Sequence, residues 1–393
     1  MCETGMVLSE LSYMIRHTKK FARKHRVMTP LAQFHVSSYQ MPCPYGVVLV
    51  MSPWNYPFML TIDPLIDAIA AGNTVMVKPS AYSPYTSQII EEILTNVFPK
   101  EYVSVILGGR KENQALLEEK FDYIFFTGSP YVGHEVMSKA SVHLTPVTLE
   151  LGGKSPCIVD ETANIKLAAR RIVFGKYLNL GQTCVAPDYI YVHTSVKDKL
   201  IHEVIQEIKR QYQDLSSYGK IINEKHFDRI SKLLDPNKIV YGGKTNRETL
   251  KIEPTIMDHV SWDDAVMQEE IFGPIMPILT FTDFEDCINI IKEKPSPLAL
   301  YLFSSNKTRV DMVTHSVPYG GGCINDTIIH LATSNMPFGG VGNSGMGGYH
   351  GKEGFKTFTH YKSIVDKKTW LDLPIRYQPY SKLYDKLIHI FLR

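Results

Sequence analysis

Cys184 stands in a setting that is unusual for a structural cysteine. It lies in the segment GQTCVAPDY, where a glycine and two polar residues precede it and a proline follows soon after. A thiolate is a strong nucleophile at neutral pH, provided that its surroundings lower the pKa of the thiol. A free cysteine taken alone is more often buried and inert. The segment by itself leaves both a nucleophile and a core residue open.

Two further motifs carry groups that could serve a nucleophile. TLELGGKSP places Glu150 in an apolar setting, where burial would raise the pKa of the carboxyl and suit a general base. VLVMSPWNYPF places Asn55 just after a β-branched run, where its amide could donate to a developing oxyanion. The structural alternatives are an exposed edge-strand position for Glu150 and a helix cap for Asn55.

Two other motifs could hold a nucleotide. FFTGSPYVG sets Gly128, Ser129 and Gly133 after an apolar run, where backbone and a helix N-terminus could approach a pyrophosphate. The spacing is GSxxxG and not the GxGxxG of the usual dinucleotide fingerprint, so an ordinary strand-to-helix turn stays open. In VMVKPS, Lys78 could reach a ribose hydroxyl or a phosphate, and a solvated lysine is the alternative.

Composition excludes several classes of protein. The chain has 393 residues, 44% hydrophobic and 21% charged, which fits a globular protein of two or three domains. A net charge of +2 offers no basic field for nucleic acid. Six scattered cysteines without a CxxC fit neither a metal site nor a disulfide framework, and favour a reducing, cytoplasmic compartment. We expect neither a signal peptide nor a membrane-spanning helix.

Short apolar runs alternate with helical patterns and must position these motifs. We expect strands at 47–50, 74–77, 103–107 and 123–126, and helices at 6–24, 63–71, 89–97 and 197–213. Continuous apolar strands that alternate with helices predict an α/β fold whose parallel sheet is covered on both faces. Ligands bind such sheets at the carboxyl ends of the strands. The glycine-rich region 318–354 is expected to be an ordered loop system.

Seven motifs occur together and in one order: SPWN, VKPS, FTGS, LELGGK, GQTC, EEIFGP and MPFGG. Together they closely resemble the aldehyde dehydrogenase superfamily over nearly the whole chain. GQTCVAPDY, PFGGVGNSGMGGYHGKEGF and DLPIRYQPY resemble its class 3, the fatty and aromatic aldehyde dehydrogenases. The resemblance implies an α/β fold with a parallel-sheet cofactor domain, an α/β catalytic domain and a small oligomerisation sheet.

The resemblance also implies roles for matching residues. Cys184 matches a nucleophile that forms a thiohemiacetal and then a thioester, and Glu150 matches the base that activates water. Asn55 and the backbone N–H of Cys184 match the oxyanion site. The residues that match the NAD or NADP site are Trp54, Lys78, Gly128, Ser129, Gly133, Glu270 and Phe272. Tyr56 and Thr183 would line the aldehyde entrance, and no metal is implied.

The implied domains are a cofactor domain at 1–152, a catalytic domain at 153–340 and a C-terminal oligomerisation segment and tail at 341–393. An oligomerisation segment near 27–44 lies within the first, and class 3 implies a homodimer. The tail YSKLYDKLIHIFLR places leucine, isoleucine and phenylalanine on one helical face beside basic residues. We expect this tail to dock near the substrate mouth or on a partner subunit, and peripheral membrane contact is the alternative.

The chain departs from the family pattern in two ways. The family has several dozen more residues before SPWN, so a truncated and non-catalytic relative is one alternative function. A cofactor-independent esterase that uses Cys184 and Glu150 is another. Ala81 stands where the family often has a glutamate that holds the ribose hydroxyls, three residues after Lys78. We therefore expect weak discrimination against NADP.

Overall fold

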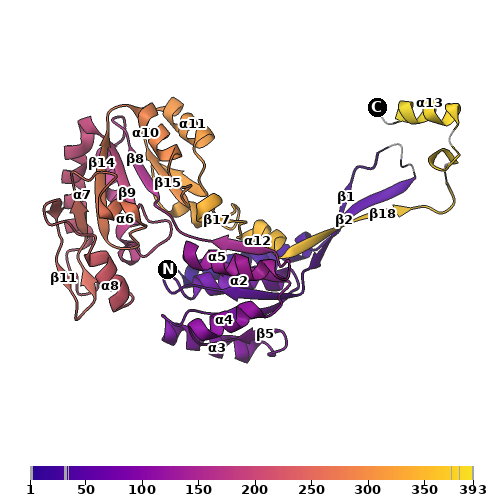
Figure 1. Ribbon diagram of the computed structural model, residues 1–393, viewed down its shortest axis with the longest axis horizontal. Helices are drawn as coiled ribbons and strands as arrows, with labels where there is room; N and C mark the ends of the chain where they lie inside the picture. Colours follow the sequence, from indigo (N-terminus) through magenta and orange to yellow (C-terminus); the bar gives the residue numbers. More distant parts are fainter. Residues whose placement is uncertain (1–2, 31–32, 34, 373, 380, 392–393) are drawn as a thin grey trace.

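The computed structural model describes residues 3–30, 33, 35–372, 374–379 and 381–391. These residues form two lobes, each built on its own sheet, and a long narrow arm that projects away from both (Figure 1). The expected α/β class is confirmed. No helix in the described ranges combines the length and the apolar character that crossing a membrane would require.

The first lobe contains a six-stranded sheet in the order β17-β7-β6-β3-β4-β5. Its strands are β3 (Val47–Met51), β4 (Thr74–Lys78), β5 (Val103–Val105), β6 (Tyr123–Thr127), β7 (Val147–Glu150) and β17 (Gly345–Met346). All pair in parallel except β17, which runs antiparallel to β7. Because β3 lies between β4 and β6, the strand order reverses there, and the loops after β3 and β6 meet at the switch point. Those loops carry Asn55 and Gly128.

Helices cover both faces of this sheet. They are α2 (Met59–Ala70), α3 (Pro84–Val97), α4 (Arg110–Glu118) and α5 (Pro130–Ser141). Alternate residues of β3 belong to different clusters: Val48 and Val50 pack with α2 and α3, and Leu49 and Met51 pack with α4 and α5. This alternation is the period-two pattern of a strand buried on both sides.

The second lobe contains a seven-stranded sheet in the order β10-β13-β14-β9-β8-β15-β16. Its strands are β8 (Pro156–Val159), β9 (Tyr189–His193), β10 (Ile239–Tyr241), β13 (Thr255–Met257), β14 (Ile275–Phe281), β15 (Ala299–Phe303) and β16 (Gly321–Ile324). Its helices are α6 (Ile165–Tyr177), α7 (Lys197–Gln211), α8 (Glu224–Ser231), α9 (Ala265–Gln268), α10 (Phe284–Lys292) and α11 (Lys307–Ser316), and β11 (Thr245–Asn246) pairs with β12 (Lys251–Ile252). Only β10 is antiparallel to its neighbour in this sheet.

The glycine-rich region 318–354 is more regular than a loop system. It supplies β16 to one edge of the second sheet and β17 to one edge of the first, and then begins α12 (Gly351–Thr357). α12 packs on α2 and on α1 (Thr4–Phe21). The region therefore connects the two lobes, and its glycines allow close backbone approach: a Cβ on Gly339 would meet the backbone of Gly347 and Gly348.

The arm is a three-stranded antiparallel sheet in the order β1-β2-β18. Its strands are β1 (His25–Val27), β2 (Val36–Pro44) and β18 (Thr359–Lys367). Figure 1 shows α13 (Lys382–Phe391) beyond the arm, away from both lobes. The tail therefore does not dock on the substrate mouth of its own chain. The ends of the tail, at 380 and 392–393, lie outside the described residues.

Helix ends differ from the sequence expectation where a distant residue caps them. α2 begins at Met59 and not at Asp63, because the Glu3 carboxylate accepts the N–H groups of Phe58 and Met59 at 2.9 and 3.2 Å. An acid at a helix N-terminus satisfies free donors and favours the helix dipole. α1 ends at Phe21, before the expected end at 24.

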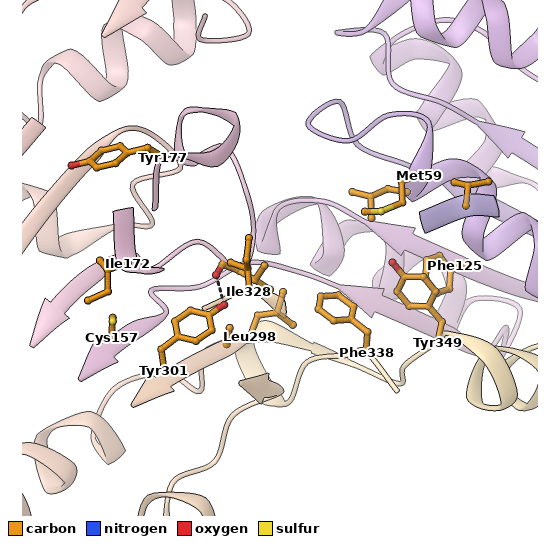
Figure 2. Packing of buried hydrophobic residues seen from close by; sticks show 14 of the residues in the cluster. Met59, Phe125, Cys157, Ile172, Tyr177, Leu298, Tyr301, Ile328, Phe338 and Tyr349 are labelled. Carbon is orange, nitrogen blue, oxygen red and sulfur yellow. Dashed lines mark hydrogen bonds between the residues drawn. The ribbon is translucent and has the colours of Figure 1, made fainter. Parts of the chain in front are cut away.

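One hydrophobic cluster spans the two lobes. Figure 2 shows Met59, Phe125 and Tyr349 on the side of the first sheet, and Tyr301 and further residues on the side of the second. The Tyr301 hydroxyl donates to the carbonyl of Val185 at 2.5 Å. This bond ties the segment that follows Cys184 to β15.

Candidate active site

Cys184 lies where two cavities meet. A cavity of about 640 Å³ and a smaller, almost wholly apolar one of about 170 Å³ are both lined by Cys184 and Leu60. Cys184 is half-buried, whereas Thr183 and Val185 on either side are buried. The thiol is therefore reachable from two directions, as a group that must meet two different molecules would be.

The segment before Cys184 has a strained backbone, and hydrogen bonds hold it in place. Asn179 and Leu180 have φ angles of +49° and +55°, in the left-handed region that non-glycine residues rarely adopt. The Gln182 side chain donates to the carbonyls of Asn179 and Lys220, each at 3.2 Å, and accepts the N–H of Ile222 at 3.0 Å. Backbone strain of this kind persists only where the surroundings impose it, and it is common at functional sites.

Asn55 reaches across from the first lobe to this segment. Its Nδ2 donates to the carbonyl of Gln182 at 3.0 Å, and its own carbonyl accepts from Nδ2 of Asn179 at 2.8 Å. Asn55 also lines the larger cavity. Its amide is thus held two residues from Cys184, and not used as a helix cap.

Glu150 ends β7 inside the same cavity and is only 2% exposed. Neither carboxylate oxygen has a hydrogen-bond partner among the described residues. β17 covers it, because Gly345 pairs directly opposite. Burial without a partner raises the pKa of this carboxyl well above its ordinary value. A carboxyl in that state is ready to exchange a proton with a bound water.

The resting thiol of Cys184 is protonated. Burial, followed by the nearby carboxyls of Glu270 and Glu150, raises its pKa to about 12, and backbone N–H groups oppose this only in part. Attack on a carbonyl therefore requires a group that takes the thiol proton or a change in the charge around it.

The turn after β6 is shaped for close approach. A Cβ on Gly128 would lie 2.5 Å from the ring of Phe126, and a Cβ on Gly133 would lie 2.7 Å from the side chain of Leu151. Ser129 is the N-cap of α5, and its Oγ accepts the N–H of Val132 at 3.5 Å. Gly128 and Ser129 line the larger cavity at this helix N-terminus. Backbone donors and the helix dipole favour an anion there.

The opposite wall of the larger cavity carries Glu270 and Phe272. Phe272 has a φ of +48° and meets the ring of Trp54 edge-on at 5.5 Å between centroids. Glu270 packs so closely on Gly152 that a side chain at that position would find no room. Burial and the charge of Asp188 raise the pKa of Glu270 to about 8.

Two of the expected cofactor residues do not line either cavity. Lys78 is buried at the end of β4, and its Nζ donates to the carbonyls of Pro79 and Gly108 at 2.9 and 2.7 Å. Burial lowers the pKa of this amine. Gly133 lies inside α5 and allows the helix to pack against Leu151.

The smaller cavity is a separate apolar pocket. It contains Tyr56 and Thr183, whose hydroxyls share a hydrogen bond at 2.8 Å. The wall also contains Met6, Met59, Leu60, Phe174, Leu178, Val185, Ile328, Ile329, Leu331, Ala332, Phe338, Tyr349 and His350. This pocket can accept an apolar chain whose reactive end meets Cys184.

Sequence reasoning missed the residues that fasten Glu270. Lys154 pairs with the Asp188 carboxylate and donates to the carbonyl of Glu269 at 2.8 Å. Asp188 accepts the N–H of Ile271 at 2.9 Å, and Arg229 donates to the carbonyl of Ile271 at 2.6 Å. Lys154 and Asp188 stand inside LELGGK and GQTCVAPDY, where a charge among apolar neighbours was a usable signal. Arg229 had none.

Among the residues that the structure describes, no group of three His, Cys, Asp or Glu side chains could hold a metal ion. The described cysteines, at 43, 157, 184, 287 and 323, are all free.

Known proteins similar to this chain are aldehyde dehydrogenases. The aldehyde dehydrogenase family profile matches residues 2–364. The 4,4'-diaponeurosporen-aldehyde dehydrogenase of Staphylococcus aureus is 48% identical over 397 residues, which is all of this chain and 86% of the relative. Aldehyde dehydrogenase family 3 member A2 of Rattus norvegicus is 43% identical, over 93% of this chain and 76% of the relative.

Solved structures of aldehyde dehydrogenases also superpose on this chain. The substrate-bound state of Staphylococcus aureus AldH superposes with a TM-score of 0.97 at 48% identity, over 100% of this chain and 86% of that one. An aldehyde dehydrogenase of Mycobacterium tuberculosis in complex with NAD+ gives a TM-score of 0.83 at 29% identity, over 91% of this chain and 76% of that one. The expected family is confirmed, and this chain belongs to the aldehyde dehydrogenase family.

Proposed function

We propose that this chain oxidises apolar aldehydes to carboxylic acids with NAD or NADP, through a covalent intermediate on Cys184. The observation that supports this most directly is the place of Cys184 between two cavities of different character. The larger one offers a helix N-terminus and polar groups, and the smaller one is apolar. A thiol at their junction can hold an aldehyde carbon within reach of a bound nucleotide.

The larger cavity fits a dinucleotide. Gly128 and Ser129 would face the pyrophosphate at the N-terminus of α5, and Glu270 would accept from ribose hydroxyls while Phe272 and Trp54 flank the nicotinamide. The cofactor, when bound, supplies the hydride acceptor. Gly152 leaves the space that Glu270 now fills.

In the first half of the reaction, Cys184 adds to the carbonyl. The thiol proton is lost to water in the larger cavity, so that the sulfur attacks as the thiolate. The sulfur forms a bond to the carbonyl carbon, and the oxyanion is stabilised by Nδ2 of Asn55 and the N–H of Cys184. When the oxyanion collapses, the carbon loses its hydrogen as hydride and becomes a thioester of Cys184.

In the second half, water cleaves this thioester. Glu150 takes a proton from the water as its oxygen bonds to the carbonyl carbon, and the same amide donors stabilise the second oxyanion. Collapse breaks the carbon–sulfur bond and releases the carboxylic acid. The expelled thiolate then regains a proton, so that the cycle releases one proton overall.

The smaller pocket supports a class of substrate, and the residue at position 81 supports a cofactor preference. The walls of the smaller pocket favour an apolar aldehyde, aliphatic or aromatic. Ala81 is exposed near the start of α3 and carries no charge that would repel a 2′-phosphate. A relative at 43% identity, from Mus musculus, is named dimeric NADP-preferring aldehyde dehydrogenase. We therefore expect this chain to use NADP as well as NAD.

The test is NAD(P)H formation from a series of aliphatic and aromatic aldehydes, with Cys184→Ala as the control. The wild type should form NAD(P)H with both cofactors, and the variant should form none. A folded wild type that gives no NAD(P)H with any aldehyde contradicts the proposal. Ester cleavage without cofactor, in the absence of aldehyde oxidation, would instead support an esterase.

A further inference from the structure

A largely buried ion pair joins the segment of the proposed base to the segment of the proposed nucleophile. Lys154 follows Glu150 in the motif LELGGK, and Asp188 follows Cys184 in the motif GQTCVAPDY. The Nζ of Lys154 pairs with the Asp188 carboxylate, and the two side chains are 20% and 4% exposed. Breaking such a pair by removing one member leaves a buried charge without a partner. The two segments are therefore fixed to each other at this point.

The same pair holds a third segment, residues 269–272, which we call the cofactor wall. It lies between α9 and β14, so no helix or strand supplies partners for its backbone. Lys154 donates to the carbonyl of Glu269 at 2.8 Å, and Asp188 accepts the N–H of Ile271 at 2.9 Å. Buried backbone groups need such partners, and hydrogen bonds that involve a charged group are the stronger kind.

The cofactor wall depends on this pair more than the nucleophile segment does. Phe272 has a φ of +48°, a conformation that persists only where the surroundings impose it. Lys154 also donates to the carbonyl of Val266 in α9 at 2.9 Å, so one ammonium ties that helix to the wall. The nucleophile segment has a separate anchor, because the Tyr301 hydroxyl donates to the carbonyl of Val185. Loss of the pair should therefore displace the wall and leave the thiol in place.

We propose that Lys154 and Asp188 are positioning residues that hold the cofactor wall against the nicotinamide half of the cofactor. The proposal rests on the proposed cofactor site, in which Glu270 and Phe272 contact that half. The two side chains bond to each other, to α9 and to the wall, all in the second lobe. The pyrophosphate turn after β6 belongs to the first lobe. Loss of the pair should weaken the binding of the nicotinamide half alone.

The experiment titrates the wild type, Lys154→Met and the double variant Lys154→Met/Asp188→Asn with NADH and with ADP, by calorimetry. NADH contains the nicotinamide half, and ADP lacks it. Both variants lose the same donor to the wall, so NADH should bind each about tenfold more weakly, the factor that one hydrogen bond to a charged group is worth. The affinity for ADP should change by less than about threefold, since sites that share no contacts behave independently.

Hydrogen exchange measures the cofactor wall without any cofactor. In Lys154→Met the peptide that contains residues 269–272 should exchange faster than in the wild type, because local opening exposes the N–H of Ile271. The peptide that contains residues 179–185 should keep the wild-type rate. Equal loss of NADH and ADP affinity, or faster exchange in both peptides, would mean that the pair only stabilises the fold, which overturns the proposal. Unchanged NADH affinity overturns it as well.

The matched control is Lys197→Met. Lys197 pairs with Asp258 at 2.9 Å in the same lobe, and the two side chains are 17% and 9% exposed, so the variant leaves a similarly buried charge behind. It should bind NADH and ADP as the wild type does.

The double variant covers the case in which Lys154→Met does not fold. It leaves no unpaired charge, and it must then show the same selective loss of NADH affinity or the proposal fails. A wild type that binds NADH no more tightly than ADP contradicts the proposed cofactor site and this proposal together. A wild type that prefers NADH, beside variants that bind it equally well, contradicts this proposal alone.

Discussion

At the scale of single residues, we propose that Glu150 sets the rate of turnover. Among the described carboxyls that line the larger cavity, Glu150 alone has both a raised pKa and two oxygens without partners. Only its carboxylate form can take a proton from water. Hydrolysis of the thioester should therefore become faster as the pH rises through the raised pKa of Glu150.

Glu150→Gln should separate the two halves of the reaction. The amide has the size of the carboxyl but cannot accept the proton, so the thioester should accumulate. Rapid mixing with an aldehyde and NAD should show one burst of NADH, followed by turnover slower by about 10² to 10⁴. The pH dependence of the slow phase should disappear.

The control for this variant is Glu118→Gln, an exposed acid on α4 that pairs with Lys139 at the surface. It should leave burst and turnover unchanged. Equal loss of the burst and of the turnover in Glu150→Gln would mean that Glu150 acts before the thioester forms, in conflict with its proposed role.

Ala81→Glu should restore a preference for NAD. The family resemblance implies that a glutamate at this position accepts from a ribose 2′-hydroxyl and repels a 2′-phosphate. We expect kcat/KM for NADP to fall about tenfold relative to that for NAD. Ala81→Gln is the uncharged control and should change the ratio much less. A wild type that already strongly prefers NAD would contradict the expectation from which this variant is designed.

At the scale of elements, three acids hold α1 and α12 against α2. Glu10, Asp63 and Asp67 are all buried, and Glu10 accepts the N–H of Gly351 at 2.6 Å. Asp63 Oδ1 and both oxygens of Asp67 have no partner among the described residues. Burial, with Glu10 adding to it, raises the pKa of both aspartates well above the ordinary value. The two aspartates at this contact are thus largely protonated.

Asp67→Asn should flatten the dependence of stability on pH. The pKa of Asp67 is higher in the folded than in the unfolded state, so its contribution is complete below the unfolded pKa of about 4 and is lost as the pH rises toward the folded pKa. The loss is about 1.4 kcal/mol for each pH unit in that window. The variant should gain more in Tm at pH 8 than at pH 5.

The control is Asp311→Asn, at an exposed position of α11. Thermal unfolding should give this variant the wild-type slope between pH 5 and 8. An Asp67→Asn protein with the same slope as the wild type would mean that Asp67 is charged in the fold.

The elements also show what sequence patterns can and cannot predict. Four strands of the first sheet, β3 to β6, were predicted from short apolar runs, whereas β7 and β17 were not. The family resemblance placed Cys184, Asn55 and Glu150 in one site, and all three line the larger cavity. The start of α2 was not predictable, because its cap is Glu3, far away in the chain. The pairing of Lys154 with Asp188 likewise depends on tertiary contacts that no local spacing encodes.

At the scale of the whole molecule, the arm combines an edge strand with exposed apolar side chains. β18 is an edge strand of the three-stranded sheet, and edge strands present backbone groups that invite pairing. Large apolar side chains along or next to the arm are exposed, among them Met28, Val365 (58%) and Trp370 (69%). Exposed apolar surface of this kind marks an interaction site. We therefore propose that a second copy covers the arm in a homodimer.

Val365→Asp should weaken that dimer. The substitution places a charge where a partner would bury an apolar side chain, and removing such a charge from water costs several kcal/mol. Since 1.4 kcal/mol is tenfold in affinity, the dissociation constant should rise at least about 100-fold. Light scattering at micromolar concentration should then report a monomer for the variant and a dimer for the wild type.

Val142→Asp makes the same change at a 73% exposed position after α5, far from the arm, and should stay dimeric. A dimeric Val365→Asp protein, or a monomeric wild type, would place the partner surface elsewhere. Because both cavities are built by one chain, the Val365→Asp monomer should still bind NADH, which separates assembly from the site itself.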